Sequence, residues 1–307
     1  MKEHSIDYDV IILGAGPAGL AAGIYTIRRG MKTLILETGI PGGRATTAPW
    51  VENYPGFDEP MTGLELTQKM YSQLNRIGGE VTSEEAVSLK LDEPIKTVMT
   101  RKRKYTAKTV IIAIGVNRRQ LHIKGEMEFL GAGVSYCSLC DGPMFRGKKV
   151  AVIGSGEEAL EDAKHLTDIA SHVILVSNDL KFSIPNRLLE PLKATSKIRI
   201  LEGYEVQSIE GERTVKSLKL KCLADGKPIS LDVDGIFIAA GVVPMTDIIA
   251  TAGVEVDKRG CILVNRKQAT NIEGVFAAGD CTCGGMQIAT AVGEGAMAAI
   301  SASRIAE

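Results

Sequence analysis

The sequence predicts an α/β protein made of two three-layer domains, the second inserted into the first. An apolar run, a glycine-rich turn, a helical stretch and a second apolar run follow one another near the N-terminus. The same order returns 140 residues later, from Gly14 to Gly154, and each copy ends in an apolar run closed by glycine. A chain of 307 residues is also too long for one ordinary core. The pattern is that of two dinucleotide-binding, Rossmann-like units.

The first copy contains every part of a βαβ unit. Residues 10–13 form a short apolar run that predicts a buried parallel strand. Residues 20–29 favour a helix, which Gly30 would cap, and residues 33–36 predict the next strand. The unit has about the length that dinucleotide binding requires.

The turn between the first strand and the helix is the sequence GAGPAG. Gly14 permits a tight turn, Gly16 lets the backbone approach a pyrophosphate, and Gly19 lets the helix pack on the strand. The N-terminus of the helix would stabilise the phosphate charge, and the acid that closes the second strand would bind ribose hydroxyls. The cofactor contacts expected from this unit are Gly14, Gly16, Pro17, Ala18, Gly19 and Glu37.

The second copy is less complete. Residues 149–153 and 173–176 predict its strands, with a helix to about Ile169 between them. Its turn supplies the candidate contacts Gly154, Gly156 and Glu157. The residues after the second strand are Ser177, Asn178 and Asp179, so no arginine meets a 2′-phosphate and no acid stands at the strand end. Either a pyridine nucleotide or an altered, non-binding site is compatible with this copy.

The domain boundaries follow from the strands that leave each copy. Residues 109–114 and 236–240 predict these strands, so Gly115 and the segment 241–244 are the expected linkers. The first domain would comprise residues 1–115 and 245–307, because the C-terminal strand and small-residue helix complete it. The second would comprise residues 116–244.

Composition and charge exclude several classes of partner. A net charge of −1 provides no general attraction to nucleic acid or to an anionic membrane. The basic run 101–104 lacks interleaved aromatic residues, which favours a solvated strand or hairpin. No apolar run reaches membrane-spanning length, and residues 1–10 contain no apolar signal core, so we expect a cytoplasmic protein.

Cys137 and Cys140 form a CxxC pair that Asp141 follows directly. A disulfide across so small a ring stabilises a fold by only about 2 kcal/mol, against about 4.7 kcal/mol for a 100-residue loop. CxxC spacing also tends to lower the pKa of one thiol, and the thiolate is the attacking species. The pair is therefore better suited to electron exchange than to stabilising the folded state.

The spacing of the other cysteines does not complete a metal site. Half of a zinc site would require two more ligands at matching spacing, and the CxC pair Cys281 and Cys283 is a poor partner for CxxC. We therefore expect no metal. Cys222 and Cys261 stand alone and are expected to be small buried hydrophobic residues. Cys281 and Cys283 are either ordinary helix-start residues or a second redox group beside Asp280.

Gly279 and Asp280 follow the last apolar strand. An acid in this position can bind the polyol of a flavin chain near the start of the next helix, or it can cap that helix. The spacing alone leaves both roles open.

These motifs together resemble the low-molecular-weight thioredoxin reductases, over essentially the whole chain. The similar segments are GAGPAG at 14–19, the pair Gly42–Gly43, VENYPGF at 51–57, CSLCDG at 137–142 and GVFAAGD at 274–280. The CxxC pair just before the second glycine turn is specific to them. The larger glutathione-reductase-like enzymes place their redox cysteines soon after the first glycine motif, whereas this chain has no cysteine before Cys137.

The resemblance implies an FAD-dependent oxidoreductase. Cys140 would lie over the flavin and receive its electrons, Cys137 would attack the disulfide of a thioredoxin-like partner, and Asp141 would transfer the proton. The family is usually a homodimer whose two domains rotate relative to each other. Further FAD contacts implied by the resemblance are Gly42, Gly43, Arg44, Asn53, Ala113, Gly115, Gly279, Asp280, Gln287, Ile288 and Ala289.

Several residues depart from the family pattern. NADPH-dependent members carry a histidine and arginines where this chain has Ser177, Asn178, Asp179 and Ser183, so the clamp for the 2′-phosphate is missing. Other departures are Met286 for an arginine, Ile114 for a threonine, and Arg44 and Ala45 for a Gln-Leu pair. Some thioredoxin reductase-like flavoproteins without the clamp take electrons from other carriers. The donor is therefore open among NADPH, NADH, reduced deazaflavin and ferredoxin.

We expect an enzyme that passes electrons from FAD through Cys137 and Cys140 to a thioredoxin-like protein. Two alternatives remain at this point. One is a flavin disulfide reductase with another acceptor, such as a peroxiredoxin. The other is a redox-sensing binding module that holds flavin and uses the CxxC pair as a switch.

Overall fold

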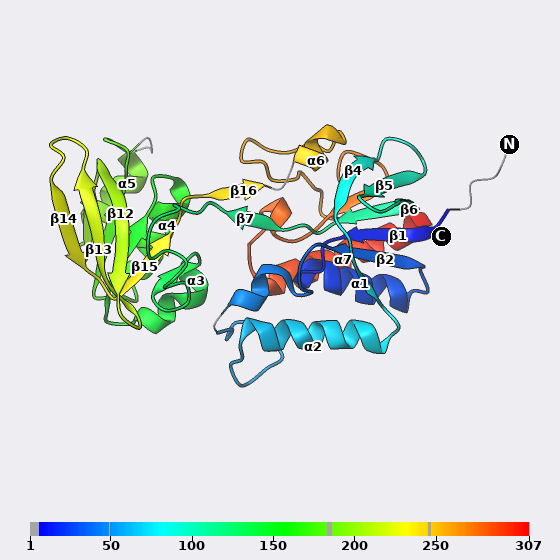
Figure 1. Cartoon of the computed structure of the whole chain (residues 1–307), viewed down its shortest axis with the longest axis horizontal. Coiled ribbons are helices and arrows are strands. Elements are labelled where there is room, and N and C mark those ends of the chain that lie inside the picture. Colours follow the sequence, from blue (N-terminus) through cyan, green and yellow to red (C-terminus); the bar gives the residue numbers. More distant parts are fainter. Residues whose placement is uncertain (1–5, 49, 183–185, 245–246, 307) are drawn as a thin grey trace. The chain divides into compact units, whose positions relative to one another are not determined.

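The computed structural model describes residues 6–48, 50–182, 186–244 and 247–306. The chain forms two compact units (Figure 1). Unit 1 comprises Met1–Asn117 and Val243–Glu307, and unit 2 comprises Arg118–Val242. Both units contain parallel strands with helices on them, and the second is inserted into the first, which confirms the predicted fold class.

Unit 1 is built on a seven-stranded sheet in the order β3-β2-β1-β6-β5-β4, with β17 also paired to β6. The pairs of β1 with β2 and β6, of β2 with β3, and of β17 with β6 are parallel, whereas β4, β5 and β6 form antiparallel pairs. Its elements are β1 (Tyr8–Leu13), α1 (Pro17–Arg28), β2 (Thr33–Glu37), η1 (Gly43–Thr47), α2 (Gly63–Arg76), β3 (Val81–Ser83), β4 (Ala86–Lys90), β5 (Lys96–Thr100), β6 (Lys104–Ile112), α6 (Asp247–Thr251), β17 (Val275–Ala277), η3 (Asp280–Thr282) and α7 (Ile288–Ala306).

The strands of unit 1 bury side chains on both faces of the sheet, as their continuous apolar runs require. Val10 and Ile12 of β1 pack into a core formed with α1, α2 and α7. Ile11 and Leu13 point to the opposite face, where a second core includes β5 and α6. Figure 1 shows α1 and α2 together on one side of the sheet. The result is a three-layer unit.

Unit 2 repeats this plan in a smaller form. Its five-stranded parallel sheet has the order β11-β10-β9-β15-β8, and β12, β13 and β14 form a separate antiparallel sheet. Its elements are β8 (Val134–Ser135), α3 (Ser138–Asp141), η2 (Gly142–Phe145), β9 (Lys149–Ile153), α4 (Glu157–Thr167), β10 (His172–Val176), α5 (Asn186–Lys193), β11 (Ile198–Leu201), β12 (Tyr204–Gly211), β13 (Val215–Cys222), β14 (Pro228–Asp232) and β15 (Gly235–Ile238). The short strands β7 (Val116–Arg118) and β16 (Val242–Pro244) pair where the chain passes from one unit to the other.

The glycine turns of the two units make corresponding backbone contacts. The amide of Gly14 donates to Leu36, and that of Gly154 donates to Val176. A Cβ on Gly14 would lie 2.4 Å from the carbonyl oxygen of Ala113, and one on Gly154 would lie 2.2 Å from that of Ala239. Only glycine fits such an approach, so the repeat in the sequence is a repeat in three dimensions.

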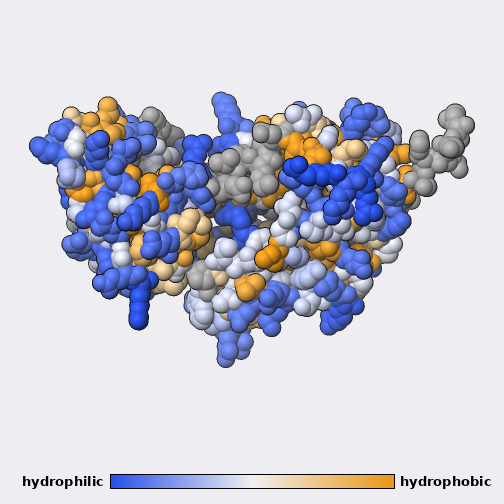
Figure 2. Space-filling view, viewed as in Figure 1, coloured by the Kyte–Doolittle hydropathy of each residue, from blue (hydrophilic) through white to orange (hydrophobic). Residues whose placement is uncertain are grey.

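Polar side chains cover most of the surface seen in one view. On the face drawn in Figure 2, hydrophobic residues occur in small groups among hydrophilic ones. Within the described ranges, no helix is long and apolar enough to cross a membrane.

The packing of α7 on α1 generates a matched pair of variants. A Cβ on Gly295 would lie 2.1 Å from the carbonyl oxygen of Ala18, whereas one on Gly293 of the same helix meets nothing within 4 Å. We expect Gly295→Ala to destabilise the protein by about 1–3 kcal/mol, because the two helices must move apart. Gly293→Ala should stabilise it by up to about 1 kcal/mol, because alanine favours a helix. Thermal unfolding midpoints check this, and equal midpoints for the two variants would contradict the packing.

Candidate redox and cofactor sites

Cys137 and Cys140 are joined by a disulfide with Cα atoms 5.3 Å apart. Cys137 is the N-cap of α3, and the amide of Cys140 donates a hydrogen bond of 3.1 Å to its sulfur. Cys137 is half-buried and Cys140 is exposed. The amide favours negative charge on Cys137, so after reduction this cysteine is the better placed to be a thiolate.

Asp141 lies at the end of the same short helix. Its carboxylate accepts a hydrogen bond of 2.6 Å from the hydroxyl of Ser135, the last residue of β8. Burial raises the pKa of Asp141 above its usual value, and the bond from Ser135 lowers it in part. A carboxyl group with a raised pKa beside a dithiol can exchange protons closer to neutral pH than an ordinary aspartate can.

The sequence analysis did not identify Ser135. This buried side chain also accepts a hydrogen bond of 3.0 Å from the amide of Cys137, so it contacts both the first cysteine and the acid. On the other side of α3, the hydroxyl of Ser138 donates to Asp162 of α4. The redox segment is thus held between β8 and α4. No pattern of spacing marks a serine for such a role.

The first glycine turn of unit 1 is open for an anion. Gly16 is the N-cap of α1, no side chain caps this helix, and its first turn contains no acid. A Cβ on Gly16 would meet nothing within 4 Å. Glu37 accepts hydrogen bonds from the amides of Ala15 and Gly39, at 2.7 and 2.8 Å, and so fixes the end of β2 beside this turn.

The Gly42–Gly43 segment lies on the same turn. The amide of Gly42 donates to the carbonyl of Ala15, and a Cβ on Gly43 would lie 3.1 Å from the Cα of Gly16. Arg44 follows in η1. Its guanidinium donates to the carbonyl of Val116 at 2.8 Å and lies 3.8 Å from the carboxylate of Asp280.

Predicted flavin contacts from distant parts of the sequence also meet. The side-chain amide of Asn53 donates to Gln287 at 3.0 Å, across 234 residues of sequence. Asp280 begins η3, directly after Gly279, whose Cβ position would clash with the side chain of Ala18 in α1. Among the remaining expected contacts, Ala113 and Gly115 follow β6, and Ile288 and Ala289 open α7.

Glu294 of α7 is a second residue that the sequence analysis did not identify. Its carboxylate accepts hydrogen bonds from the amide of Gly279 at 2.7 Å and from the hydroxyl of Thr282 at 3.2 Å. Burial raises its pKa, and the nearby charge of Asp280 adds to this effect. Glu294 therefore holds both ends of the turn that carries Asp280.

These observations fit FAD in unit 1. The open start of α1 would receive the pyrophosphate, Glu37 would face the ribose, and Asn53, Asp280 and Gln287 would lie along the flavin half. All of them follow the carboxyl ends of the parallel strands, where ligands bind in open α/β sheets.

The glycine turn of unit 2 differs in charge. Gly156 caps α4 without a side-chain contact, as Gly16 caps α1, but the first turn of α4 carries Glu157 and Glu158. Two carboxylates at a helix N-terminus already interact with the positive end of the helix dipole, and their negative charge would repel a phosphate placed there. After β10, Ser177 is buried, and its hydroxyl accepts a hydrogen bond from the amide of Asp179. No cationic side chain stands at positions 177–179, and Ser183 lies outside the described residues.

The expectation for Cys261 is wrong in part. This residue is buried, as expected, but it forms a disulfide with Cys283. Cys222 and Cys281 are free, and burial raises the pKa of Cys281 to about 12. Bonds between cysteines that are 22 residues apart cannot be deduced from one sequence, because several pairings are compatible with the same spacing.

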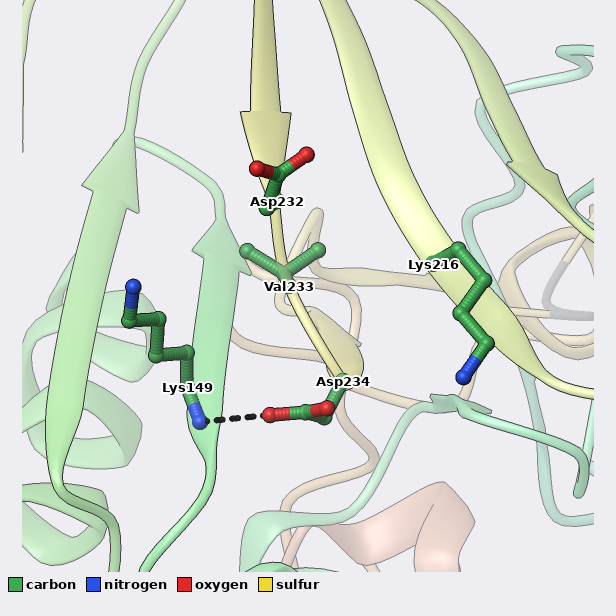
Figure 3. Close-up of a pocket in the computed structure, with 5 residues that line it drawn as sticks. All are labelled: Lys149, Lys216, Asp232, Val233 and Asp234. Carbon is green, nitrogen blue, oxygen red and sulfur yellow. Dashed lines mark hydrogen bonds between the residues drawn. The ribbon is translucent and has the colours of Figure 1, made fainter.

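A pocket in unit 2 is separate from all of these residues (Figure 3). Its lining consists of Lys149, Lys216, Asp232, Val233 and Asp234, and the backbone amide of Lys149 donates to Asp234 at 2.9 Å. Lys149 is the first residue of β9, so the pocket lies at the amino end of the parallel strands, opposite to the glycine turn. The described residues contain no group of three or more His, Cys, Asp or Glu side chains that could hold a metal ion.

Comparisons with known proteins agree with this arrangement. The family model described as pyridine nucleotide-disulphide oxidoreductase matches residues 8–295. The thioredoxin reductase of Listeria innocua is 37% identical over 98% of this chain and 94% of its own length. A crystal structure of thioredoxin reductase from Streptococcus pyogenes superimposes with a TM-score of 0.92, at 34% identity and 97% coverage of both chains.

A more distant superposition concerns another kind of reductase. A ferredoxin-flavin thioredoxin reductase from Clostridium acetobutylicum matches with a TM-score of 0.53, at 33% identity and 97% coverage of both chains. The extent of these matches is sufficient to assign a family. The chain belongs to the pyridine nucleotide-disulphide oxidoreductase family and has the fold of the low-molecular-weight thioredoxin reductases.

Proposed function

We propose that the chain is an FAD-dependent thioredoxin reductase that works through Cys137 and Cys140. The observation that carries this proposal is the partly exposed disulfide of Cys137 and Cys140, followed directly by Asp141, an acid whose pKa is raised by burial, within the second of two Rossmann-like units. The names of the homologues favour thioredoxin as the acceptor over a peroxiredoxin or a purely sensory role.

The surroundings of the disulfide suit a protein substrate. Leu139, between the two cysteines, and Met144, just after them, are large hydrophobic side chains that are 56% and 47% exposed. Exposed apolar groups beside a reactive disulfide can contact a partner protein and exclude water from the exchange.

The proposed cycle assigns one step to each side chain. FAD, when bound in unit 1, supplies the two electrons that reduce the disulfide to a dithiol. Cys137, as the thiolate, attacks the disulfide of thioredoxin and forms a mixed disulfide, while Asp141 protonates the departing sulfur. Cys140 then attacks Cys137, which releases reduced thioredoxin and restores the original disulfide.

The electron donor is the part of the proposal in which this chain differs from an NADPH enzyme. The carboxylates at the start of α4 and the lack of a cation at positions 177–179 both disfavour a phosphorylated dinucleotide. The similar protein from Clostridium acetobutylicum is named for ferredoxin, which favours such a donor here. A homodimer and a cytoplasmic location remain predictions from the resemblance and the sequence.

Single cysteine variants test the division of roles. We expect Cys140→Ser to trap a mixed disulfide with oxidised thioredoxin, because Cys137 can attack and nothing resolves the product. Cys137→Ser should form no such product and should abolish thioredoxin reduction. Nonreducing gels and mass spectrometry read the result, with Cys222→Ser as the control because Cys222 is a free cysteine elsewhere in unit 2. If Cys137→Ser trapped a mixed disulfide and Cys140→Ser did not, the roles of the two cysteines would be reversed. Full reduction of thioredoxin by Cys137→Ser would refute the mechanism.

Asp141 and Ser135 can be tested through the pH dependence of the rate. Asp141→Asn should slow thioredoxin reduction by roughly 10²-fold or more, because proton transfer is lost. Ser135→Ala removes the hydrogen bond that favours the ionised carboxylate, so the pKa of Asp141 should rise. The limb of the pH–rate profile that belongs to this acid should then move to higher pH. An unchanged profile in Ser135→Ala would exclude Asp141 as the titrating group.

The donor is identified by anaerobic bleaching of the flavin. We expect slow bleaching with NADPH and NADH, and faster bleaching with reduced ferredoxin or reduced deazaflavin. The double variant Glu157→Gln, Glu158→Gln should improve the affinity for either pyridine nucleotide by about fivefold, because it removes two negative charges from the N-terminus of α4. Glu161→Gln, further along the exposed side of α4, is the matched control. A micromolar KM for NADPH, much lower than for NADH, would contradict the expectation.

A further inference from the structure

The disulfide between Cys261 and Cys283 links two loops of unit 1. Its Cα atoms are 5.7 Å apart, and its cysteines are separated by 22 positions in sequence. Cys261 is only 3% exposed, whereas Cys283 is half-buried and more accessible to a small reagent. The bond has no place in the cycle proposed for Cys137 and Cys140.

The loop that contains Cys283 carries two of the expected flavin contacts. Asp280 comes three positions before it and Gln287 four positions after it. The backbone between them is unusual, because Cys283 and Met286 have φ values of 58° and 51°, in the left-handed region that non-glycine residues rarely adopt. A segment in such a conformation persists only when its surroundings hold it in place.

The other cysteine lies on a firmly bound turn. The side chain of Asp257 accepts a hydrogen bond of 2.9 Å from the amide of Cys261, and the amide of Asp257 donates 2.8 Å to the carbonyl of Cys261. The amide of Ile262 also donates to the carbonyl of Cys281, which joins the two loops a second time. The disulfide therefore ties an irregular loop to a well-anchored one.

Cys281 is not part of this disulfide. It is buried, and its thiol donates toward the carbonyls of Ile112 and Ala278. Of the three cysteines in this region, only Cys261 and Cys283 are bonded.

We propose that Cys261 and Cys283 form a reversible modification site, at which disulfide formation holds the loop from Asp280 to Gln287 in its FAD-binding conformation. This inference rests on the proposed FAD site of unit 1. In the oxidised form, FAD would be retained tightly, and reduction of the bond would loosen the loop and weaken its retention.

The exchange is balanced with a low-molecular-weight disulfide as the oxidant. The thiolate of Cys283, the more exposed cysteine, attacks one sulfur of that reagent, forms a mixed disulfide and releases one thiolate. The thiolate of Cys261 then attacks the sulfur of Cys283 and releases the second. The protein loses two electrons, and the reagent leaves as two thiols after protonation. A dithiol reverses both steps.

The pairing itself is tested by thiol mapping. In the full chain with Cys137→Ser and Cys140→Ser, four cysteines remain. After treatment with oxidised glutathione, removal of excess reagent and labelling in denaturant, we expect maleimide on Cys281, maleimide or glutathione on the half-buried Cys222, and neither on Cys261 and Cys283. Peptide mapping should recover residues 261 and 283 as one cross-linked pair. Labelling of all four cysteines, or a cross-link between any other pair, would overturn the proposal.

The effect on the cofactor is measured in the same background. We expect the dissociation constant for FAD to rise roughly tenfold when a dithiol reduces the protein, because the loop loses its preorganisation. Further substitution of Cys261→Ser and Cys283→Ser should give the weaker value with or without dithiol, whereas Cys222→Ser should behave like the parent. Equal affinities for FAD in the oxidised and reduced parent would refute the loop mechanism. Failure to bind FAD in any state would instead refute the proposed function, and the thiol map would still stand.

Discussion

The close approach of a glycine turn to a neighbouring strand is the constraint on which both units depend. In each unit, the first glycine lies so near the backbone after the adjacent strand that no side chain fits. This contact brings the start of a helix to the carboxyl end of the sheet. The amide of Gly42 donates to the carbonyl of Ala15 in the turn of unit 1, and Gly279, directly before Asp280, packs against Ala18 of α1.

The two units share this geometry but differ in charge. The start of α1 is uncapped and free of acids, whereas the start of α4 carries Glu157 and Glu158. A similar turn would therefore favour a bound anion in unit 1 and disfavour one in unit 2. In the proposed function, this difference would let the chain keep the fold and the dithiol of a thioredoxin reductase with a weaker use of a phosphorylated dinucleotide.

Much of the fold could be predicted from the sequence, because both βαβ units carry their signals locally. Apolar runs, glycine turns and Glu37 lie next to one another in the chain, so short-range patterns identify them. The interactions that could not be predicted follow no spacing rule, although they join residues 6, 15 and 22 positions apart: Ser135 with Asp141, Gly279 with Glu294, and Cys261 with Cys283. Their partners are set by tertiary packing, and a serine, a glutamate or a lone cysteine carries no local signature of it. Asn53 and Gln287 were identified as expected flavin contacts only through the resemblance to a family, and their hydrogen bond to each other was not predicted.

The central claim is that the disulfide of Cys137 and Cys140 accepts two electrons, and that the resulting dithiol passes them to thioredoxin. An anaerobic reductive titration of the FAD-loaded protein with dithionite tests it most directly. The wild-type protein should take up two electrons more per chain than the variant with Cys137→Ser and Cys140→Ser, and oxidised thioredoxin should withdraw electrons from the wild type only. Equal uptake by the two proteins, with equal reoxidation by thioredoxin, would contradict the account.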